Sequence, residues 1–441
     1  MSRTLLRGAQ VSTMSANRPD WERIDVLIDG DQIAGLGRHL QSDDAHTIDL
    51  AGRVLIPGLV NAHLHSWQTA LRGVGVDWTL PEYFTHVHAG VATQYTPEDV
   101  RIGTLAGALN QINCGTTTLG DWSHNNRTPE HADAAIESLS AAGIRGVFFY
   151  GTPYAATDAV YPVGEIDRLL AGRFSCGGLL TLGMAIKGPQ FSPAELAVAD
   201  CRAAHERGLV VTMHQSGGEP ADGWAAVHDA GLFGPSTNVA HGAGLTDEWV
   251  KVLVDAGVTF TATPENELSQ GHADPITGRL LELGSAPSLG TDVESVVSGD
   301  VLTAARVALA HQRGLDHDRH RRSFGTPCPT ATITSKQALE WATVEGARAL
   351  GLADRVGRIE PGMQADLVVI DARQLNLWPM QDPIAAALHA GVGNIEAVMI
   401  GGTWRKRDHQ LVGVDLDDVK DRLLESGQRL RAKLETVGSH L

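Results

Sequence analysis

The sequence predicts an α/β fold in which a barrel of parallel strands is joined to a small sheet domain built from both ends of the chain. Strand-like and helix-like segments alternate through the middle of the 441 residues, whereas both ends are rich in strands. Regular alternation favours a parallel sheet, and eight strand–helix units close such a sheet into a barrel. Candidate ligand residues also follow several of the middle strands, and barrels of this kind carry their active sites at the carboxyl ends of the strands.

The two ends of the chain supply the predicted sheet domain. Asp29-Gly30 lies between two apolar runs and is typical of a hairpin turn. Residues 357–371 predict a turn followed by a buried strand, in the same style as the N-terminal segment. We therefore expect residues 1–56 and 357–441 to form this domain and residues 57–356 to form the barrel.

The middle of the chain supplies the strands and helices of the predicted barrel. Helices are expected at residues 97–113, 130–142, 193–207, 247–256 and 335–350. Strands are expected at residues 116–119, 145–150, 179–186, 209–214, 238–242, 258–262 and 286–292. A last amphipathic helix, at residues 418–434, is expected to pack on the outside of the barrel.

His63 and His65 are the most informative residues of the chain. They follow a short apolar strand and a Pro-Gly break, at the end of the run 57–65. Side chains two residues apart on a strand point to the same face, so the two imidazoles can approach one cation. A single pair of this kind is a weak signal, because packed or exposed histidines give the same pattern.

Further ligand-type residues strengthen this interpretation. His214, His241 and Asp292 each end an apolar, strand-like run, and helix-like segments separate them. Imidazole nitrogens and carboxylate oxygens are the usual donors for zinc and similar divalent ions. One such residue alone is more often structural than catalytic. The ordered recurrence at strand ends instead predicts a metal site at one edge of the barrel.

Composition limits the partners of this protein. The formal net charge of −17 argues against binding nucleic acid or anionic membranes through bulk electrostatics. The sequence shows neither the apolar core of a signal peptide nor an apolar run long enough to span a bilayer. The four scattered cysteines are typical of reduced cytosolic thiols. We expect a cytoplasmic protein that binds a small molecule.

Several motifs together resemble one known group of enzymes. PGLVNAHLH at 57–65, CGTTTLGD at 114–121, LGTD at 289–292 and GRIEPGMQADLVVID at 357–371 carry the resemblance, together with the two later histidines. The chain resembles the amidohydrolase superfamily, within the branch of cytosine deaminases, S-adenosylhomocysteine deaminases and triazine hydrolases. This resemblance implies a (β/α)8 TIM barrel with a small β-sandwich built from both termini.

The resemblance also implies a metal site and a reaction. His63, His65, His214 and Asp292 would hold one divalent ion, for which zinc is preferred and iron remains open. Asp292 would carry a proton from water to the leaving group, and His241 would contact the water or the developing oxyanion. The expected function is hydrolysis of non-peptide C–N bonds in a small heterocyclic or amide-like substrate, by a homo-oligomer.

The sequence departs from the deaminase pattern at residue 217. In deaminases of this branch, the histidine that corresponds to His214 is followed three residues later by a glutamate, which carries a proton to the substrate ring. This chain has Gly217 at that position. Glu219, Glu265 and Glu267 are possible replacements, and glycine could also be required for a positive φ. We therefore expect poor turnover of cytosine, adenosine and S-adenosylhomocysteine.

Residues after the predicted strands are candidates for contact with the substrate. Aromatic side chains mixed with a few polar groups suit a flat, partly apolar ligand. Ordinary loop packing is the competing interpretation for each of them. The candidates are Gln68, Trp78, His86, His88, Trp122, His124, Lys187, Gln215, Glu265, Glu267 and His272.

Two alternatives remain open at this point. Lys187 follows the fourth predicted barrel strand, where binuclear amidohydrolases carry a carboxylated lysine that bridges two metals. The chain would then be a peptidase- or lactonase-like enzyme. The second alternative is a non-catalytic relative that binds a ligand on the same scaffold, although such a protein has no need for a complete set of metal ligands.

Overall fold

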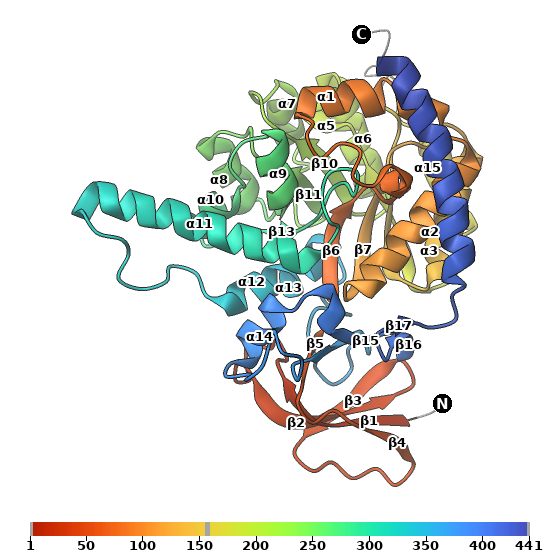
Figure 1. Cartoon of the computed structure of the whole chain (residues 1–441). Helices are drawn as coiled ribbons and strands as arrows, with labels where there is room; N and C mark the ends of the chain where they lie inside the picture. The colour runs from red at the N-terminus through yellow and green to blue at the C-terminus, as the bar shows by residue number, and fades with distance from the viewer. Residues whose placement is uncertain (1–2, 155–158, 439–441) are drawn as a thin grey trace.

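An eight-stranded parallel sheet closes into a barrel at the centre of the molecule (Figure 1). This computed structural model describes residues 3–154 and 159–438. The barrel strands are β6 (Leu59–Leu64), β7 (Thr116–Ser123), β8 (Arg145–Tyr150), β9 (Leu180–Ala185), β10 (Val211–Gln215), β11 (Thr237–His241), β12 (Thr259–Ala262) and β13 (Ser288–Leu289). A parallel bridge between Leu64 and Asp292 joins the last strand to the first. The predicted barrel is confirmed.

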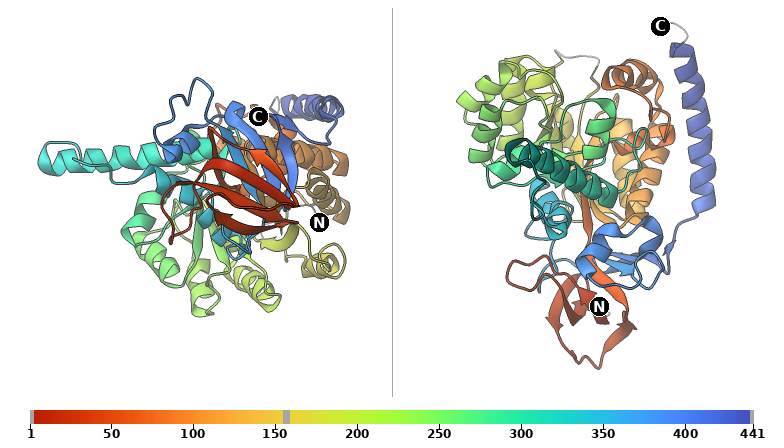
Figure 2. Two further views of the ribbon diagram at one scale, coloured as in Figure 1. Left: turned by 90° about the horizontal axis from the view of Figure 1, so that it is seen from below. Right: turned by 60° about the vertical axis from the view of Figure 1, so that its left-hand side comes forward.

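Helices surround the barrel on its outside (Figures 1 and 2). The outer helices are α2 (Pro97–Asn113), α3 (Pro129–Ala142), α4 (Val163–Ala171), α6 (Ala194–Glu206), α7 (Gly223–Asp229), α8 (Asp247–Asp255), α10 (Thr277–Glu282), α11 (Val301–Phe324), α12 (Ser335–Trp341) and α13 (Val344–Ala349). Shorter helices lie in the loops that follow the strands: η1 (Ser66–Leu71), α1 (Leu80–Tyr83), η2 (Phe84–His88), η3 (Val91–Gln94), α5 (Gly188–Phe191) and α9 (Pro264–Gln270).

Two differences from the predicted helices have physical reasons. The helix expected at 335–350 is two helices, because the chain leaves the helical conformation at Thr343, where φ is −135°. Helix α11 was not predicted, and it projects from the barrel in Figure 1. Its outer half is mostly charged, so it lacks the continuous apolar stripe that marks a helix packed on a core.

Both ends of the chain meet in a mixed sheet below the barrel (Figures 1 and 2). Its strands are β1 (Arg3–Val11), β2 (Glu22–Asp29), β3 (Gln32–Gly37), β4 (Ala45–Asp49), β5 (Arg53–Pro57), β14 (Leu367–Asp371), β15 (Ile395–Ile400), β16 (Thr403–Arg407) and β17 (Gln410–Leu411). Antiparallel pairing of β5 with β14 joins the N-terminal strands to the C-terminal ones. A short helix, α14 (Pro383–His389), lies between β14 and β15. The sheet has an apolar core of its own.

The junction between sheet and barrel is tightly packed. β5 leads into β6 through Gly58, where an added Cβ would lie 1.9 Å from the hydroxyl of Thr117. No side chain fits there, so only glycine allows the sheet to approach the barrel this closely. Next to it, Arg145 of β8 donates to Asp366 at 2.7 Å, and both side chains are almost fully buried.

The C-terminal helix α15 (Leu416–Gly438) runs along the outside of the barrel, as expected (Figures 1 and 2). It contacts α2 and η1. Arg422 pairs with Glu98 at 2.7 Å, and Ser426 donates to Asp99 at 2.7 Å. Within residues 3–154 and 159–438, we find no helix with the length and apolar character that a membrane span requires.

The buried pair at the junction gives a test of the fold. Replacing Arg145 with Met leaves the Asp366 carboxylate buried without its cationic partner, and breaking such a pair costs about 3–5 kcal/mol. We expect a loss of this size in the free energy of unfolding, measured with urea. Lys251→Ala is the control, because it breaks an exposed pair with Asp255 and should cost about 1 kcal/mol or less. Equal effects of the two changes would contradict the importance of the junction.

Candidate metal centre and active site

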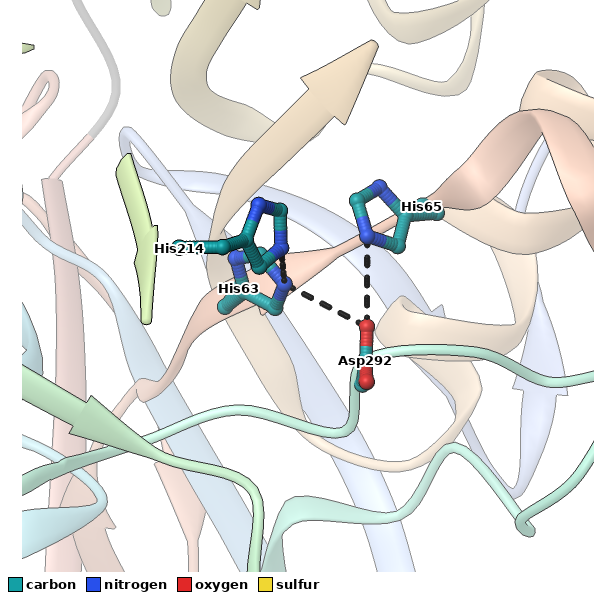
Figure 3. A group of neighbouring side chains, drawn as sticks. All are labelled: His63, His65, His214 and Asp292. Atoms are coloured by element: carbon teal, nitrogen blue, oxygen red, sulfur yellow. Dashed lines mark hydrogen bonds and ion pairs between the residues drawn. The ribbon is translucent and has the colours of Figure 1, made fainter. Parts of the chain in front are cut away.

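Four side chains meet at the carboxyl end of the barrel (Figure 3). His63 lies in β6 and His65 directly after it, His214 lies in β10, and Asp292 follows β13. Each offers one ligand atom, and these atoms all lie within 4.8 Å of one another. All four side chains are buried. The strand-end residues selected from the sequence therefore lie together in one cluster.

The distances in this cluster fit a divalent metal ion. Asp292 Oδ1 lies 3.3 Å from His63 Nε2 and 3.2 Å from His65 Nε2, and the Nε2 atoms of His63 and His214 are 3.2 Å apart. With zinc–nitrogen bonds of about 2.0–2.1 Å, two donors of a tetrahedral site lie about 3.3 Å apart. Three imidazoles and one carboxylate are also a suitable donor set for such an ion.

Neighbouring groups orient two of the imidazoles. His65 Nδ1 lies 2.7 Å from the carbonyl oxygen of Trp122, which can only accept, so Nδ1 carries the proton and Nε2 turns a lone pair toward the cluster. His214 Nδ1 lies 2.8 Å from the hydroxyl of Tyr154. Burial lowers the pKa of His63 to about 4 and that of His214 well below its ordinary value. Neutral imidazoles are the form that binds metal.

The cluster lies on the seam where the barrel closes. Asp292 N donates to His63 O at 3.0 Å, and His65 N donates to Asp292 O at 2.7 Å. Gly290 allows this approach, because an added Cβ would lie 2.7 Å from His63 Cβ. Burial alone would raise the pKa of Asp292, but its close contacts with the rings of His63 and His65 hold that pKa well below its ordinary range.

His241 lies beside the cluster without joining it. Its Nε2 is 3.9 Å from Asp292 Oδ2, so this edge of the ring faces the same centre. Its Nδ1 lies 3.1 Å from Glu267 Oε1 and 3.1 Å from Thr263 Oγ1. Burial lowers the pKa of His241 and raises that of Glu267 to about 7. A histidine and a carboxylate thus form a buried pair behind the candidate metal site.

A small cavity opens onto the cluster. One wall is apolar or aromatic and the other is polar, which suits a flat ligand with a few hydrogen-bonding atoms. The apolar wall contains Leu80, Tyr83, Phe84, Tyr154 and Phe191. Ser216, Gln270, His272 and His88 line the cavity together with His65, His214, His241 and Asp292.

Some predicted contact residues lie at the cavity and others lie behind it. His88 and His272 line it. Trp122 and His124 pack against the ligand imidazoles, with centroids 4.2 Å from His214 and His65 respectively. Gln68 Nε2 donates to the Tyr83 hydroxyl at 2.5 Å and so supports the aromatic wall. Gln215 Oε1 accepts from Trp224 at 2.8 Å, which is a structural contact.

Four other candidates do not line the cavity, and their contact with a substrate stays a prediction. Trp78 and His86 pack on each other with centroids 4.8 Å apart. Glu265 is partly buried and interacts with Ser298. Lys187 is buried and acts electrostatically on Asp200 of α6, which lies outside the barrel sheet. None of these four is among the described side chains that line the cavity.

Sequence reasoning missed three contributors. Tyr154 and Phe191 follow β8 and β9, so their positions after strands were a usable signal, but their distance from the strand ends hid it. Asn266 donates to Asp292 Oδ2 at 2.5 Å, and its neighbour Glu267 contacts His241. No pattern in the sequence indicates that side chains of α9 contact Asp292 and His241.

Gly217 has a steric explanation. An added Cβ there would lie 2.4 Å from the carbonyl oxygen of His272, so the turn after α9 occupies the space that a side chain would need. The positive φ considered for this position falls instead on Gly218, where φ is 100°. Glu219 is exposed to solvent, whereas Glu267 is fully buried. Of the three candidate acids, Glu267 is the one that contacts His241 beside the cluster.

Comparison with known proteins agrees with this geometry. Residues 54–405 match the profile of the Amidohydrolase family. The 5-methylthioadenosine/S-adenosylhomocysteine deaminase of Symbiobacterium thermophilum is 27% identical, over 98% of this chain and 99% of its own length. The 5'-deoxyadenosine deaminase of Methanosarcina mazei is 26% identical, over 99% of this chain and 100% of its own.

Solved structures share the fold. An adenosine deaminase from Xanthomonas campestris with bound zinc has a TM-score of 0.84 and 22% identity, over 98% of this chain and 99% of its own. The atrazine chlorohydrolase TrzN from Arthrobacter aurescens TC1, complexed with zinc, has a TM-score of 0.83 and 21% identity, over 96% and 100% of the two chains. The resemblance deduced from the motifs is confirmed.

Metal content tests the cluster directly. Replacing His214 with Ala removes one of four converging donors, so we expect most of the bound divalent ion to be lost, as measured by elemental analysis. His228→Ala, which changes a half-exposed histidine on α7, is the matched control and should retain the ion. Unchanged metal content in His214→Ala would refute the ligand assignment. Two ions per chain in the unmodified protein would favour a binuclear centre.

Proposed function

This chain belongs to the amidohydrolase family, and on that premise we propose that it is a single-metal hydrolase of non-peptide C–N bonds in a small heterocyclic or amide-like substrate. The observation that carries the proposal is the convergence of three imidazole nitrogens and one carboxylate oxygen at a small cavity. Zinc is the proposed ion, because histidine and carboxylate donors suit it and because solved relatives contain it.

The cavity supports a flat and uncharged substrate. Among the described residues that line it, Asp292 is the only aspartate, glutamate, lysine or arginine. A substrate carrying a phosphate or carboxylate near the reacting atom would therefore find no cationic side chain there. The aromatic side chains offer ring faces for stacking, and Ser216, Gln270 and His272 offer hydrogen bonds.

Each residue of the site has a proposed role. His63, His65, His214 and Asp292 would hold the ion, which when bound lowers the pKa of water and polarises the electrophile. Asp292 takes a proton from the attacking water and delivers it to the leaving group. His241 turns its Nε2 toward the same centre, where this nitrogen accepts a hydrogen bond from the attacking water. The aromatic wall excludes bulk water from this reaction.

The binuclear peptidase- or lactonase-like alternative receives little support. It requires Lys187 between two ions, whereas the Lys187 charge acts on Asp200 of an outer helix. A non-catalytic binding protein would not need the complete set of metal ligands that this chain carries. We keep both as outcomes of metal analysis and of assays on a broad substrate panel.

A second candidate function is deamination of 5'-modified adenosines. Relatives named for such substrates align with nearly the whole chain. Gly217 argues against deamination, because a glycine at this position provides no proton donor for the purine ring. Displacement at an amide, urea or halogen-substituted carbon needs no such donor, so we favour it.

Other properties follow as parts of the same proposal. We place the catalytic domain at residues 57–356 and the sheet domain with its C-terminal helix at residues 1–56 and 357–441. We also propose a cytoplasmic homo-oligomer that acts on small molecules and takes no part in nucleic-acid or membrane binding. Size-exclusion chromatography with light scattering tests the oligomeric state.

Asp292→Asn tests the chemistry. The amide keeps the shape of the carboxylate but cannot carry the proton, so we expect turnover to fall about 10²-fold or more. His241→Asn should cost a similar factor, because it removes the imidazole nitrogen that accepts from the attacking water. Steady-state kinetics with an active substrate measures both effects. Near-native turnover in Asp292→Asn would exclude its role as proton carrier.

Ammonia and halide release decide between the two candidate functions. We expect the zinc-loaded enzyme to turn over substituted triazines or similar small heterocycles better than cytosine, adenosine or S-adenosylhomocysteine, because the ring-protonating carboxylate is missing at residue 217. Ammonia and halide are measured across the whole panel at equal enzyme concentration. Efficient ammonia release from any of the last three substrates would overturn this preference and identify a deaminase.

A further inference from the structure

The two proposed catalytic side chains leave the backbone from unusual conformations. His241 has a φ of 67° and Asp292 a φ of 60°, both in the left-handed region that residues other than glycine rarely adopt. Such a conformation persists only where surrounding contacts hold it. Contacts with neighbouring residues must therefore fix the directions of these two side chains.

Two consecutive residues of α9 make those contacts. Asn266 Nδ2 donates to Asp292 Oδ2 at 2.5 Å. His241 Nδ1 lies 3.1 Å from Glu267 Oε1, to which it can donate. Both α9 side chains have no measurable exposure to solvent, and neither lines the cavity. They reach the catalytic groups from behind.

Helix α9 is itself held firmly. Thr263 N donates to Glu267 Oε1 at 2.9 Å, which fixes the carboxylate before it meets His241. After the helix, the backbone amides of Gly271 and His272 donate to Glu267 O at 3.1 and 3.0 Å. The carbonyl of His272 then packs where a side chain at residue 217 would stand. The turn after α9 can therefore keep this position only because residue 217 has no side chain.

We propose that Asn266 and Glu267 are positioning residues for the hydrolysis. Asn266 prevents rotation of the Asp292 carboxylate, so that Oδ1 faces the histidine ligands and Oδ2 faces His241. Glu267 fixes the tautomer of His241 with the proton on Nδ1, so that Nε2 faces the cavity. This inference rests on the proposed function but makes a separate claim about two residues outside the metal-ligand set.

The first test is kinetic and uses the metal-loaded full-length chain. Asn266→Ala and Glu267→Leu should each lower kcat about 10- to 100-fold, since small misplacements of reacting groups cost factors of this size, with KM and zinc content unchanged. Glu267→Gln should retain most of the activity, because its amide oxygen still accepts from His241. Glu265→Gln is the matched control on the same helix, because its carboxyl interacts with Ser298 and not with the proposed catalytic pair.

A spectroscopic readout keeps the test independent of substrate. ¹⁵N NMR of the imidazoles, with the His241 signals assigned through their loss in His241→Asn, should show one tautomer in the zinc-loaded wild type and in Glu267→Gln. Glu267→Leu should show a mixture. In the cobalt-substituted protein, Asn266→Ala should shift the visible absorption bands through its effect on Asp292, and Glu267→Leu should leave them nearly unchanged.

Several outcomes would overturn the proposal. An unchanged tautomer in Glu267→Leu, or unchanged cobalt bands in Asn266→Ala, would show that α9 does not orient the pair. Loss of zinc in parallel with activity would show a merely structural role. Equal damage from Glu267→Gln and Glu267→Leu would assign the effect to charge rather than position. If the spectra change as expected while no substrate reacts, the positioning claim stands and the proposed function fails.

Discussion

Closure of the barrel between its last and first strands is the constraint on which the site depends. β13 is only two residues long, and the contact continues through backbone hydrogen bonds between Asp292 and the residues around His63 and His65. Three of the four donors lie on this seam, and His214 approaches from β10 across the barrel. The donors meet only when every intervening strand is in register. Barrel assembly and formation of the metal site are therefore one structural event.

The electrostatics of the site suit a doubly charged cation. Burial keeps the surrounding imidazoles neutral, so they contribute lone pairs without adding positive charge. Negative charge comes from the Asp292 carboxylate and, behind His241, from Glu267, whose pKa is raised by burial. A bound divalent ion would stabilise the ionised form of both groups. Two carboxylates then balance two positive charges in a region closed to solvent.

Much of this arrangement could be predicted from sequence because strand ends are marked by composition. Apolar runs that end in His or Asp identify both the strand and the side chain at its carboxyl end, which is enough to find His214 and Asp292. The same logic fails on α9. Glu265 and Glu267 lie two positions apart and so about 200° apart around a helix, which turns only one of the two carboxylates toward His241. Only the packed structure shows that Glu267 is the one that contacts His241. Helix α11 escaped prediction because its outer half is solvated. The role of Lys187 stays a prediction, because a position after a strand does not fix the direction of a long side chain.

The close approach of the His272 carbonyl to Gly217 has a consequence for how this enzyme could change through mutation. A carboxylate at residue 217 cannot enter while the turn at 270–272 keeps its path, since even the first carbon of the side chain collides with backbone. Adaptation toward ring-protonating chemistry would have to remodel the turn first, in variants that gain nothing from that step alone. The order of substitutions is thus restricted by sterics, and libraries that vary residue 217 together with residues 270–272 would reach sequences that single substitutions cannot.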